Sequence, residues 1–170
     1  MKRFGFTLLE LMVTLSVMSI LALIAVPSFT GMHDRYRLKG AVDTLYADLQ
    51  FARSEAVRRN GPIFIGFSTG ASWCYGLDSE NACDCETQGD CDLKVVNALD
   101  YPAVTLTSTN FRGAVTSFKP RLGTVSKAGT VVFQSSKGKE ARAIVSPLGR
   151  VSRCSPAGSA SITYYPSCSI

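Results

Sequence analysis

The stretch from Lys2 to Val26 reads KRFGFTLLELMVTLSVMSILALIAV. After Thr7 it is almost wholly apolar, because one acidic and three hydroxyl side chains alone interrupt the run. A helix of about 20 apolar residues, rising about 1.5 Å per residue, matches the hydrocarbon core of a bilayer. The two cations before the run favour a cytoplasmic N-terminus, and no A-x-A cleavage site follows it. The sequence therefore predicts a retained single-pass membrane helix, with the rest of the chain exported.

Glu10 is the charged exception within this run. A carboxylate at membrane depth costs roughly 3 kcal/mol and usually serves a function, although one near the interface stays hydrated at little cost. The flanking residues favour the functional alternative. The segment Lys2–Glu10 resembles the type III signal of the type IV pilin superfamily: a short basic leader, Gly5 before the cut, aromatic Phe6 after it, and glutamate at the fifth mature position.

This resemblance implies both processing and assembly. Residues 1–5 would be a leader that a prepilin peptidase removes between Gly5 and Phe6, after which Phe6 is N-methylated. Glu10 of one subunit would then neutralise the Phe6 amine of a neighbour, because each charge is costly in hydrocarbon and tolerable as a pair. Residues 6–29 would form the transmembrane helix and, after assembly, the core of a helical filament of pilins or pseudopilins.

A second helical pattern follows in residues 30–61. Apolar residues recur at spacings of four and three, as in an amphipathic helix: Leu38, Val42, Leu45, Leu49, Ala52 and Ala56. The opposite face, which includes Asp43 and Asp48, is expected to be polar, and Asn60-Gly61-Pro62 is a strong stop signal. One helix from Leu8 to Arg59 is therefore predicted. The stripe also suits a coiled coil, but its short length and the strand-like sequence after it favour packing on a sheet of this chain.

Residues 62–170 are expected to form an antiparallel β domain. Short runs rich in β-branched and aromatic residues are separated by Gly, Pro and Asn: Ile63–Ser68, Ser72–Leu77, Val104–Thr107, Ala114–Phe118, Thr130–Gln134, Ala141–Ser146 and Ser161–Tyr165. One long helix packed on such a sheet is an α+β fold. Residues 49–60, 72–77 and 148–151 also resemble GspH/FimT-type minor pilins and pseudopilins, so the resemblance spans nearly the whole chain and implies a type IV pilin-like fold.

The six cysteines form a central group of four and a C-terminal pair: Cys74, Cys83, Cys85, Cys91, Cys154 and Cys168. Exported thiols usually form disulfides. A zinc site is the weaker alternative, because the spacing is not C-x₂-C and the single histidine, His33, lies far away in sequence. Cys154–Cys168 is the favoured pair because it would pin the C-terminus. Cys74–Cys83 and Cys85–Cys91 are a guess for the rest.

The charge is divided along the chain. The net value of +5 comprises +3 for residues 1–73, −6 for residues 74–111 and +8 for residues 112–170. The acidic segment invites a calcium hypothesis, but the twelfth residue counted from Asp84 is Val95 where an EF-hand has glutamate. A solvated acidic loop stapled by disulfides is favoured instead.

The basic C-terminal segment suits DNA phosphate, with candidates Lys137, Lys139, Arg142, Arg150 and Arg153. It resembles the Gly-Arg-x-Arg motif of FimT-type DNA-uptake receptors, but here Gly149-Arg150-Val151-Ser152-Arg153 places the second arginine one residue late. In an extended strand that residue faces the opposite side. A merely solvated face, or one docked on the acidic loop of a neighbouring subunit, is the favoured alternative.

The expected function is structural. The signal, span, helix and β domain imply a minor pilin that takes part in type IV pilus assembly or initiation at or near the tip. The alternatives are a pseudopilin of a type II secretion system and a pilus-borne DNA receptor for transformation. The implied location is the bacterial inner membrane, followed by the periplasmic or extracellular filament. No enzyme activity, cofactor or metal is expected, because no nucleophile or paired-carboxylate motif is present and histidine is scarce.

Overall fold

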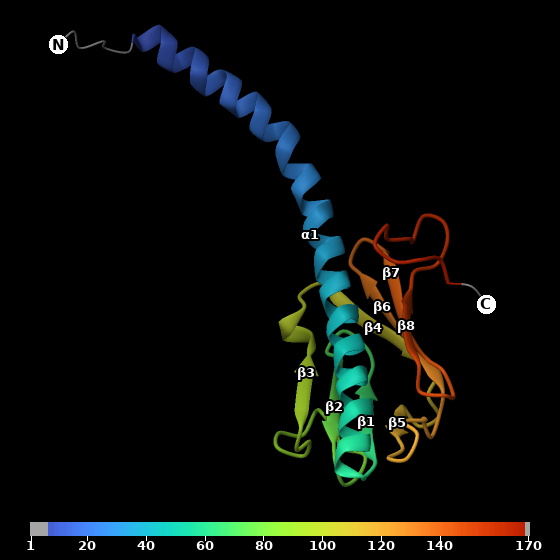
Figure 1. The fold of residues 1–170 in the computed structure, drawn as a ribbon. Helices are drawn as coiled ribbons and strands as arrows, with labels where there is room; N and C mark the ends of the chain where they lie inside the picture. The colour runs from blue at the N-terminus through green and yellow to red at the C-terminus, as the bar shows by residue number, and fades with distance from the viewer. Residues whose placement is uncertain (1–6, 169–170) are drawn as a thin grey trace, which may run out of the picture. The chain divides into compact units, whose positions relative to one another are not determined.

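The computed structural model describes residues 7–168, and residues 24–30 by their backbone alone. Over that range it has one long helix, α1 (Leu8–Arg59), followed by eight strands and a short 3-10 helix (Figure 1). The chain divides into two compact units, residues 1–33 and residues 34–170. The predicted bounds of the helix and the α+β fold class are confirmed.

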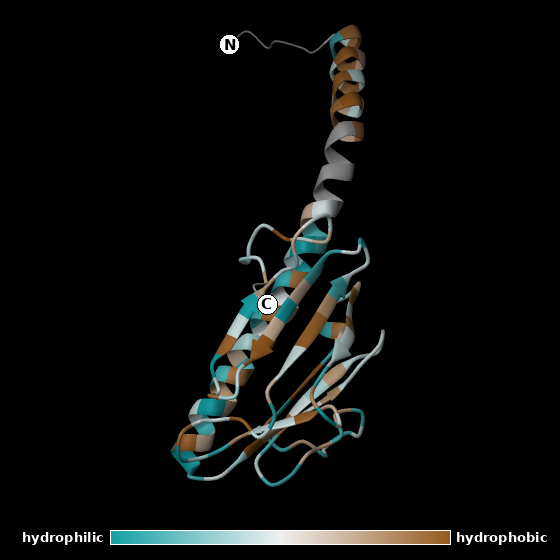
Figure 2. Ribbon diagram, turned by 90° about the vertical axis from the view of Figure 1, so that its right-hand side faces the viewer, coloured by the Kyte–Doolittle hydropathy of each residue, from teal (hydrophilic) through white to brown (hydrophobic). Residues whose placement is uncertain are grey.

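In the first unit, the described side chains of α1 are exposed and mostly apolar (Figure 2). Thr7 caps the helix, because its Oγ1 accepts a hydrogen bond from the Glu10 backbone N–H at 3.2 Å. The hydroxyls of Thr14, Ser16 and Ser19 donate to carbonyls one turn earlier. Among the described residues, no helix has the length and apolar character needed to cross a membrane. The transmembrane helix over residues 6–29 stays a prediction.

In the second unit, the predicted apolar stripe of α1 is buried, with each of its six side chains fully inaccessible. Asp48 departs from the sequence expectation, because it is only 6% exposed rather than part of a solvated face. The helix ends where Asn60 takes a left-handed conformation (φ 52°) and the Gly61 N–H bonds to the Ala56 carbonyl. This end agrees with the predicted stop signal.

Two four-stranded antiparallel sheets pack with α1. The first has the order β3-β2-β1-β5 and consists of β1 (Ile63–Ser68), β2 (Cys74–Asp78), β3 (Lys94–Asn97) and β5 (Val115–Phe118). The second has the order β4-β6-β7-β8 and consists of β4 (Val104–Thr109), β6 (Gly129–Ser135), β7 (Glu140–Val145) and β8 (Val151–Cys154). A short 3-10 helix, η1 (Ala98–Asp100), joins β3 to β4.

The core joins α1 to both sheets through a cluster of aromatic side chains. The Trp73 ring stacks on Tyr75 and meets Phe133 of β6 edge-on at 5.1 Å between centroids. Its indole N–H donates to the Val104 carbonyl at 2.8 Å, so this buried polar group is satisfied. The two sheets are therefore held in one core and position the loops described below.

Six of the seven predicted strand runs overlap strands of the structure, one run is not a strand, and two strands were not predicted. The run Ser161–Tyr165 lies in a turn and not in a strand. There the Ile162 side chain is buried and its N–H donates to the Ser155 hydroxyl, so the segment folds onto the end of β8. Strands β3 and β8 were not predicted, because each has four residues and its extended conformation depends on pairing with β2 or β7.

Candidate functional site

The first candidate region is the start of α1. Glu10 is exposed on the first helical turn, where its backbone is held by the Thr7 cap. Gly5 and Phe6, the predicted cleavage and methylation residues, lie outside the described residues. The structure thus supplies an accessible carboxylate near the helix start, and its pairing with the amine of another subunit stays a prediction.

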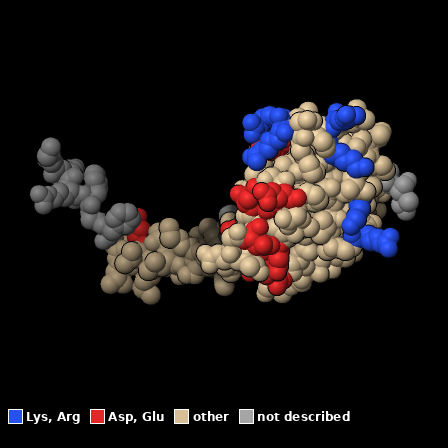
Figure 3. Space-filling model, turned by 90° about the horizontal axis from the view of Figure 1, so that it is seen from below, with Lys and Arg blue, Asp and Glu red and all other residues tan. Residues whose placement is uncertain are grey.

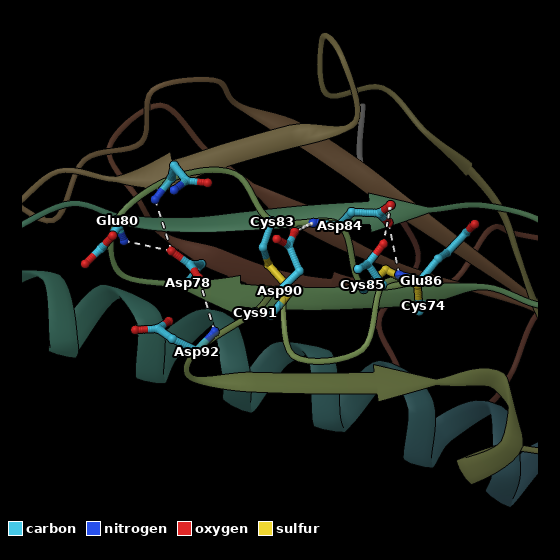
Figure 4. Close-up of a disulfide and its surroundings, with 12 residues drawn as sticks. Cys74, Asp78, Glu80, Cys83, Asp84, Cys85, Glu86, Asp90, Cys91 and Asp92 are labelled. Atoms are coloured by element: carbon cyan, nitrogen blue, oxygen red, sulfur yellow. Dashed lines mark hydrogen bonds between the residues drawn. A yellow bond between two sulfur atoms is a disulfide. The ribbon is translucent and has the colours of Figure 1, made fainter.

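The second region is the acidic loop after β2; one disulfide fastens it to Cys74 of β2, and a second links two residues within the loop (Figure 4). The pairs are Cys74–Cys85 and Cys83–Cys91, with Cα–Cα separations of 5.9 and 5.2 Å, so the pairing guessed from sequence is wrong. The reason is the course of the loop, which places two of the sulfurs over Gly76 of β2. A Cβ there would lie 2.2 Å from the Cys91 Sγ, so that position requires glycine.

Asp78, at the end of β2, organises the same loop. Its Oδ1 accepts the backbone N–H groups of Glu80 and Asn81 at 2.8 and 3.0 Å, and its Oδ2 accepts that of Asp92 at 3.1 Å (Figure 4). Burial acts to raise the pKa of Asp78, but these backbone hydrogen bonds outweigh it and hold the pKa below its ordinary value. The acids of this loop therefore shape its backbone rather than stand as a free anionic cluster.

The C-terminal tail forms a third region, fixed to β8 and to α1. The predicted Cys154–Cys168 disulfide is present, with the Cα atoms 4.9 Å apart. The Tyr165 hydroxyl donates to Asp43 Oδ1 on α1 at 2.6 Å, and Arg153 of β8 forms an ion pair with the same oxygen. The tail is thus tied down covalently at one point and by a shared carboxylate at another.

Asp43 is the centre of this network. Burial acts to raise its pKa, but donors on Lys39, Tyr165 and Arg153 lower it below the ordinary value. The Arg153 guanidinium also lies over the Tyr46 ring, 4.1 Å from its centroid. The Arg153 side chain therefore joins β8 to α1 through these contacts.

Asp48 joins α1 to the first sheet in a similar way. It accepts hydrogen bonds from the Lys94 ammonium of β3 and the Tyr75 hydroxyl of β2, each at 2.7 Å. Burial, with the neighbouring charge of Asp48 as a second cause, raises the pKa of Tyr75. Sequence reasoning missed this cluster, although the position of Asp48 beside the stripe residues Leu45 and Leu49 is a signal that it faces the core.

Four of the five predicted DNA-binding residues interact within the chain. Arg153 is paired as described, Arg142 forms an ion pair with Glu140, and the Lys139 ammonium donates to the Ser159 carbonyl at 2.6 Å. Lys137 also has an interaction partner. Arg150 differs, because it is exposed at the β7–β8 turn and its side chain forms no ion pair with any residue from 7 to 168.

Two further cations, which the sequence did not single out, lie on a loop that touches this turn. Lys119 and Arg121 follow β5, are exposed, and form no ion pair within the described range. Their loop contacts the turn closely, since a Cβ on Gly149 (φ 76°) would lie 1.8 Å from the Gly123 carbonyl oxygen. Arg150, Lys119 and Arg121 thus form a group of exposed cations without ion pairs in residues 7–168, and this group differs from the predicted set of five.

The separation of charge is visible on the surface. In Figure 3 the largest groups of Asp and Glu side chains lie close together on this face, and the Lys and Arg side chains stand in separate groups around them. Among the side chains that the structure describes, no three His, Cys, Asp or Glu residues are grouped as metal ligands.

Two family models match the chain. One, described as "Type II transport protein GspH", matches residues 41–149, and the other, described as "Prokaryotic N-terminal methylation motif", matches residues 1–26. The first covers most of the second compact unit, and the second covers the predicted leader, cleavage site and most of the apolar run.

Two solved structures are similar, both of the type IV minor pilin FimU from Pseudomonas aeruginosa strain PAO1. The crystal form in space group P21 matches with 21% sequence identity and a TM-score of 0.53, over 71% of this chain and 90% of that one. The form in space group P65 matches with 22% identity and a TM-score of 0.50, over 68% of this chain and 91% of that one. At this level of identity the likeness shows a shared fold.

Proposed function

The chain belongs to the GspH family of type IV pilins and pseudopilins, and on that premise we propose that it is a minor pilin of a type IV pilus. It enters the filament through the N-terminal part of α1 and takes part in assembly or initiation at or near the tip, a structural rather than catalytic role. The observation that carries the proposal is the order of the chain: methylation motif, apolar helix with Glu10, then a GspH-type domain.

The proposal includes a course of maturation. Residues 1–5 are a leader, residues 6–29 the transmembrane and filament-core helix, residues 30–61 its amphipathic continuation, and residues 62–170 the disulfide-stapled β domain. A prepilin peptidase in the inner membrane cuts between Gly5 and Phe6, and Phe6 is then N-methylated. The methylation-motif match over residues 1–26 supports this course.

Substitution of Glu10 tests the proposal. In cells that lack the native gene, full chains carrying Glu10→Ala or Gly5→Arg are expected to be absent from sheared filaments, because the first lacks the partner for the neighbouring amine and the second keeps its leader. Immunoblots of filaments and the mass of the mature N-terminus are the measurements. Met18→Leu, which conserves apolar volume, serves as the control. Filaments that contain uncleaved Gly5→Arg chains would contradict the proposal.

A pseudopilin of a type II secretion system is the second candidate, favoured by the description of the matching family model. Identification of the subunits that co-purify with the wild-type chain distinguishes the pilus from the secretion system, because these subunits are either pilus components or secretion components. DNA reception is a third candidate, for which the exposed Arg150 provides the support. It is tested separately by the salt dependence of DNA binding.

A further inference from the structure

The two sheets have four edges, and the chain's own loops close two of them. The edge of β5 is covered by the following loop, where Ser126 N–H bonds to the Ser117 carbonyl and Lys119 N–H to the Thr124 carbonyl, at 2.8 and 2.7 Å. At β4, the Gly70 N–H bonds to the Leu106 carbonyl at 2.8 Å. The edges of β3 and β8 have no third strand beside them in the described part of the chain. An open edge presents unpaired N–H and C=O groups to a further strand.

The β8 edge is open over Val151–Arg153. The Ser146 N–H bonds to the Arg150 carbonyl across the β7–β8 pair. In an antiparallel ladder, residues that bond to the neighbouring strand alternate with residues whose N–H and C=O groups point away from it. The N–H groups of Val151 and Arg153 therefore point away from β7. The tail closes the edge at the next outward position, where Ser155 N–H bonds to the Pro166 carbonyl and Cys168 N–H to the Ser155 carbonyl, both at 3.0 Å. A further strand can therefore lie beside the residues before Ser155.

Two hollows border this open edge. One of about 390 Å³ is lined by α1 and tail residues that include Tyr46 and Tyr165, and the other, of about 500 Å³, is lined by Arg150, Ile144 of β7 and the Cys154–Cys168 disulfide. Both hollows are lined in part by Ser152, Arg153 and Pro166, so they are neighbours at β8. Successive side chains of an added strand point to opposite faces and would enter the two hollows in turn.

The β3 edge is the second open one, and it is acidic. The Ala98 N–H bonds to the Trp73 carbonyl at 2.9 Å. By the same alternation, the backbone groups of Val96 point to β2 and the Val95 N–H points to the free edge. The Val95 side chain is 40% exposed. Asp92 precedes this strand and Asp100 follows it. The Asp100 carboxylate accepts the Asn97 N–H at 3.2 Å, so the outward N–H that remains for a further strand is that of Val95.

We propose that the β3 edge of one copy of this chain pairs with the β8 edge of a second copy. The two open edges differ in charge: Asp92 and Asp100 flank β3, whose Lys94 is paired with Asp48, whereas exposed Arg150 precedes β8, whose Arg153 is paired with Asp43. The contact is heterologous and leaves one β3 and one β8 edge free, so it extends as an open array. It rests on the proposed function, since a ladder this short gains its strength from copies that the membrane helices hold at high local concentration.

Photo-crosslinking of the full chain tests this contact. p-Benzoylphenylalanine replaces Ser152 on β8, or Ser108 on the opposite edge of the same sheet as a matched control, and membranes of cells that make the chain are irradiated. A covalent dimer is expected for position 152, with the adduct mapped by mass spectrometry to residues 92–100 of the second copy. No dimer, an adduct outside these residues, or an adduct to another protein overturns the proposal, as does an equal yield from position 108.

Two pairs of variants in the 152-labelled chain identify the contact. Val95→Pro removes the outward N–H without removing a bond to β2, and is expected to lower the dimer yield at least fivefold, whereas Val95→Ala retains it. Arg150→Glu is expected to lower the yield similarly, whereas Arg150→Lys retains it. Intact disulfides and near-UV circular dichroism confirm folding of each variant. A yield that is insensitive to both variants overturns the proposal. Filament incorporation of the Glu10 variants is measured separately, so failure of the contact and failure of the proposed function are distinguishable.

Discussion

At the scale of single residues, two arginines three positions apart have different roles. Arg153 is paired with Asp43 and lies over the Tyr46 ring, whereas Arg150 is exposed at a turn. Sequence reasoning treated both as candidate ligands for phosphate. The sequence places Arg153 one residue later than in the motif that it resembles, but the partner of Arg153 on α1 lies 110 residues earlier and no local pattern reveals it.

Substitutions of these two arginines should therefore differ in their effect on the free energy of unfolding. We expect Arg153→Ala to lower the free energy of unfolding by about 1–2 kcal/mol, since it removes a charge-assisted hydrogen bond and a cation–π contact. Arg150→Ala should change it by no more than about 0.5 kcal/mol. Denaturant unfolding of the full chain in detergent micelles, followed by near-UV circular dichroism with the disulfides intact, measures both. Equal effects of the two variants would contradict the assignment.

At the scale of elements, what the sequence predicted depends on how local the determining contacts are. Helix α1 was predicted to the residue, because its apolar spacing and its stop signal are contained within its own sequence. The four-residue strands β3 and β8 and the pairing Cys74–Cys85 were missed, because each depends on a partner that the fold brings close. For the same reason the side chain of Asp48 was predicted to be exposed to solvent, although it is buried and accepts hydrogen bonds from Lys94 and Tyr75.

The acidic loop should lose stability on acidification. The pKa of Asp78 is lower in the folded chain than its ordinary value of 3.8, so its contribution is fully present above about pH 4 and is lost as the pH falls through the folded value. Asp78→Asn is expected to lower the free energy of unfolding by about 1–2 kcal/mol at pH 7 and to flatten its decline below pH 4. Glu80→Gln, whose side chain is exposed, is the control. Unfolding curves between about pH 2 and pH 7 measure this, and an unchanged decline in Asp78→Asn would disprove the role of that carboxylate.

At the scale of the whole molecule, the net charge of +5 is less informative than its distribution and its pairing. The segment with +8 supplied the DNA hypothesis, yet four of the five residues chosen from it interact within the chain. Three exposed cations that form no ion pair within residues 7–168 lie together: Arg150 on its turn, and Lys119 and Arg121 on the loop that touches it. Arg112, before β5, is a further exposed cation without an ion pair in that range. A basic segment becomes a phosphate-binding face only to the extent that its cations are free.

The number of cations without an ion pair in the group around Arg150 predicts the salt dependence of DNA binding by the full chain in detergent micelles. Each phosphate contact contributes about −0.9 to the slope of log K against log salt concentration for duplex DNA, so binding through the group of Arg150, Lys119 and Arg121 predicts a slope of about −2 to −3. Binding of this kind is weak and is expected to vanish near physiological salt. Arg150→Gln should reduce the magnitude of the slope by about 1, whereas Arg142→Gln should leave it unchanged, because that guanidinium is already paired with Glu140. A mobility-shift titration over several salt concentrations measures these slopes. A slope steeper than about −5, reduced equally by both variants, would show that the chain's internal pairs open to bind DNA and would make DNA reception the stronger function.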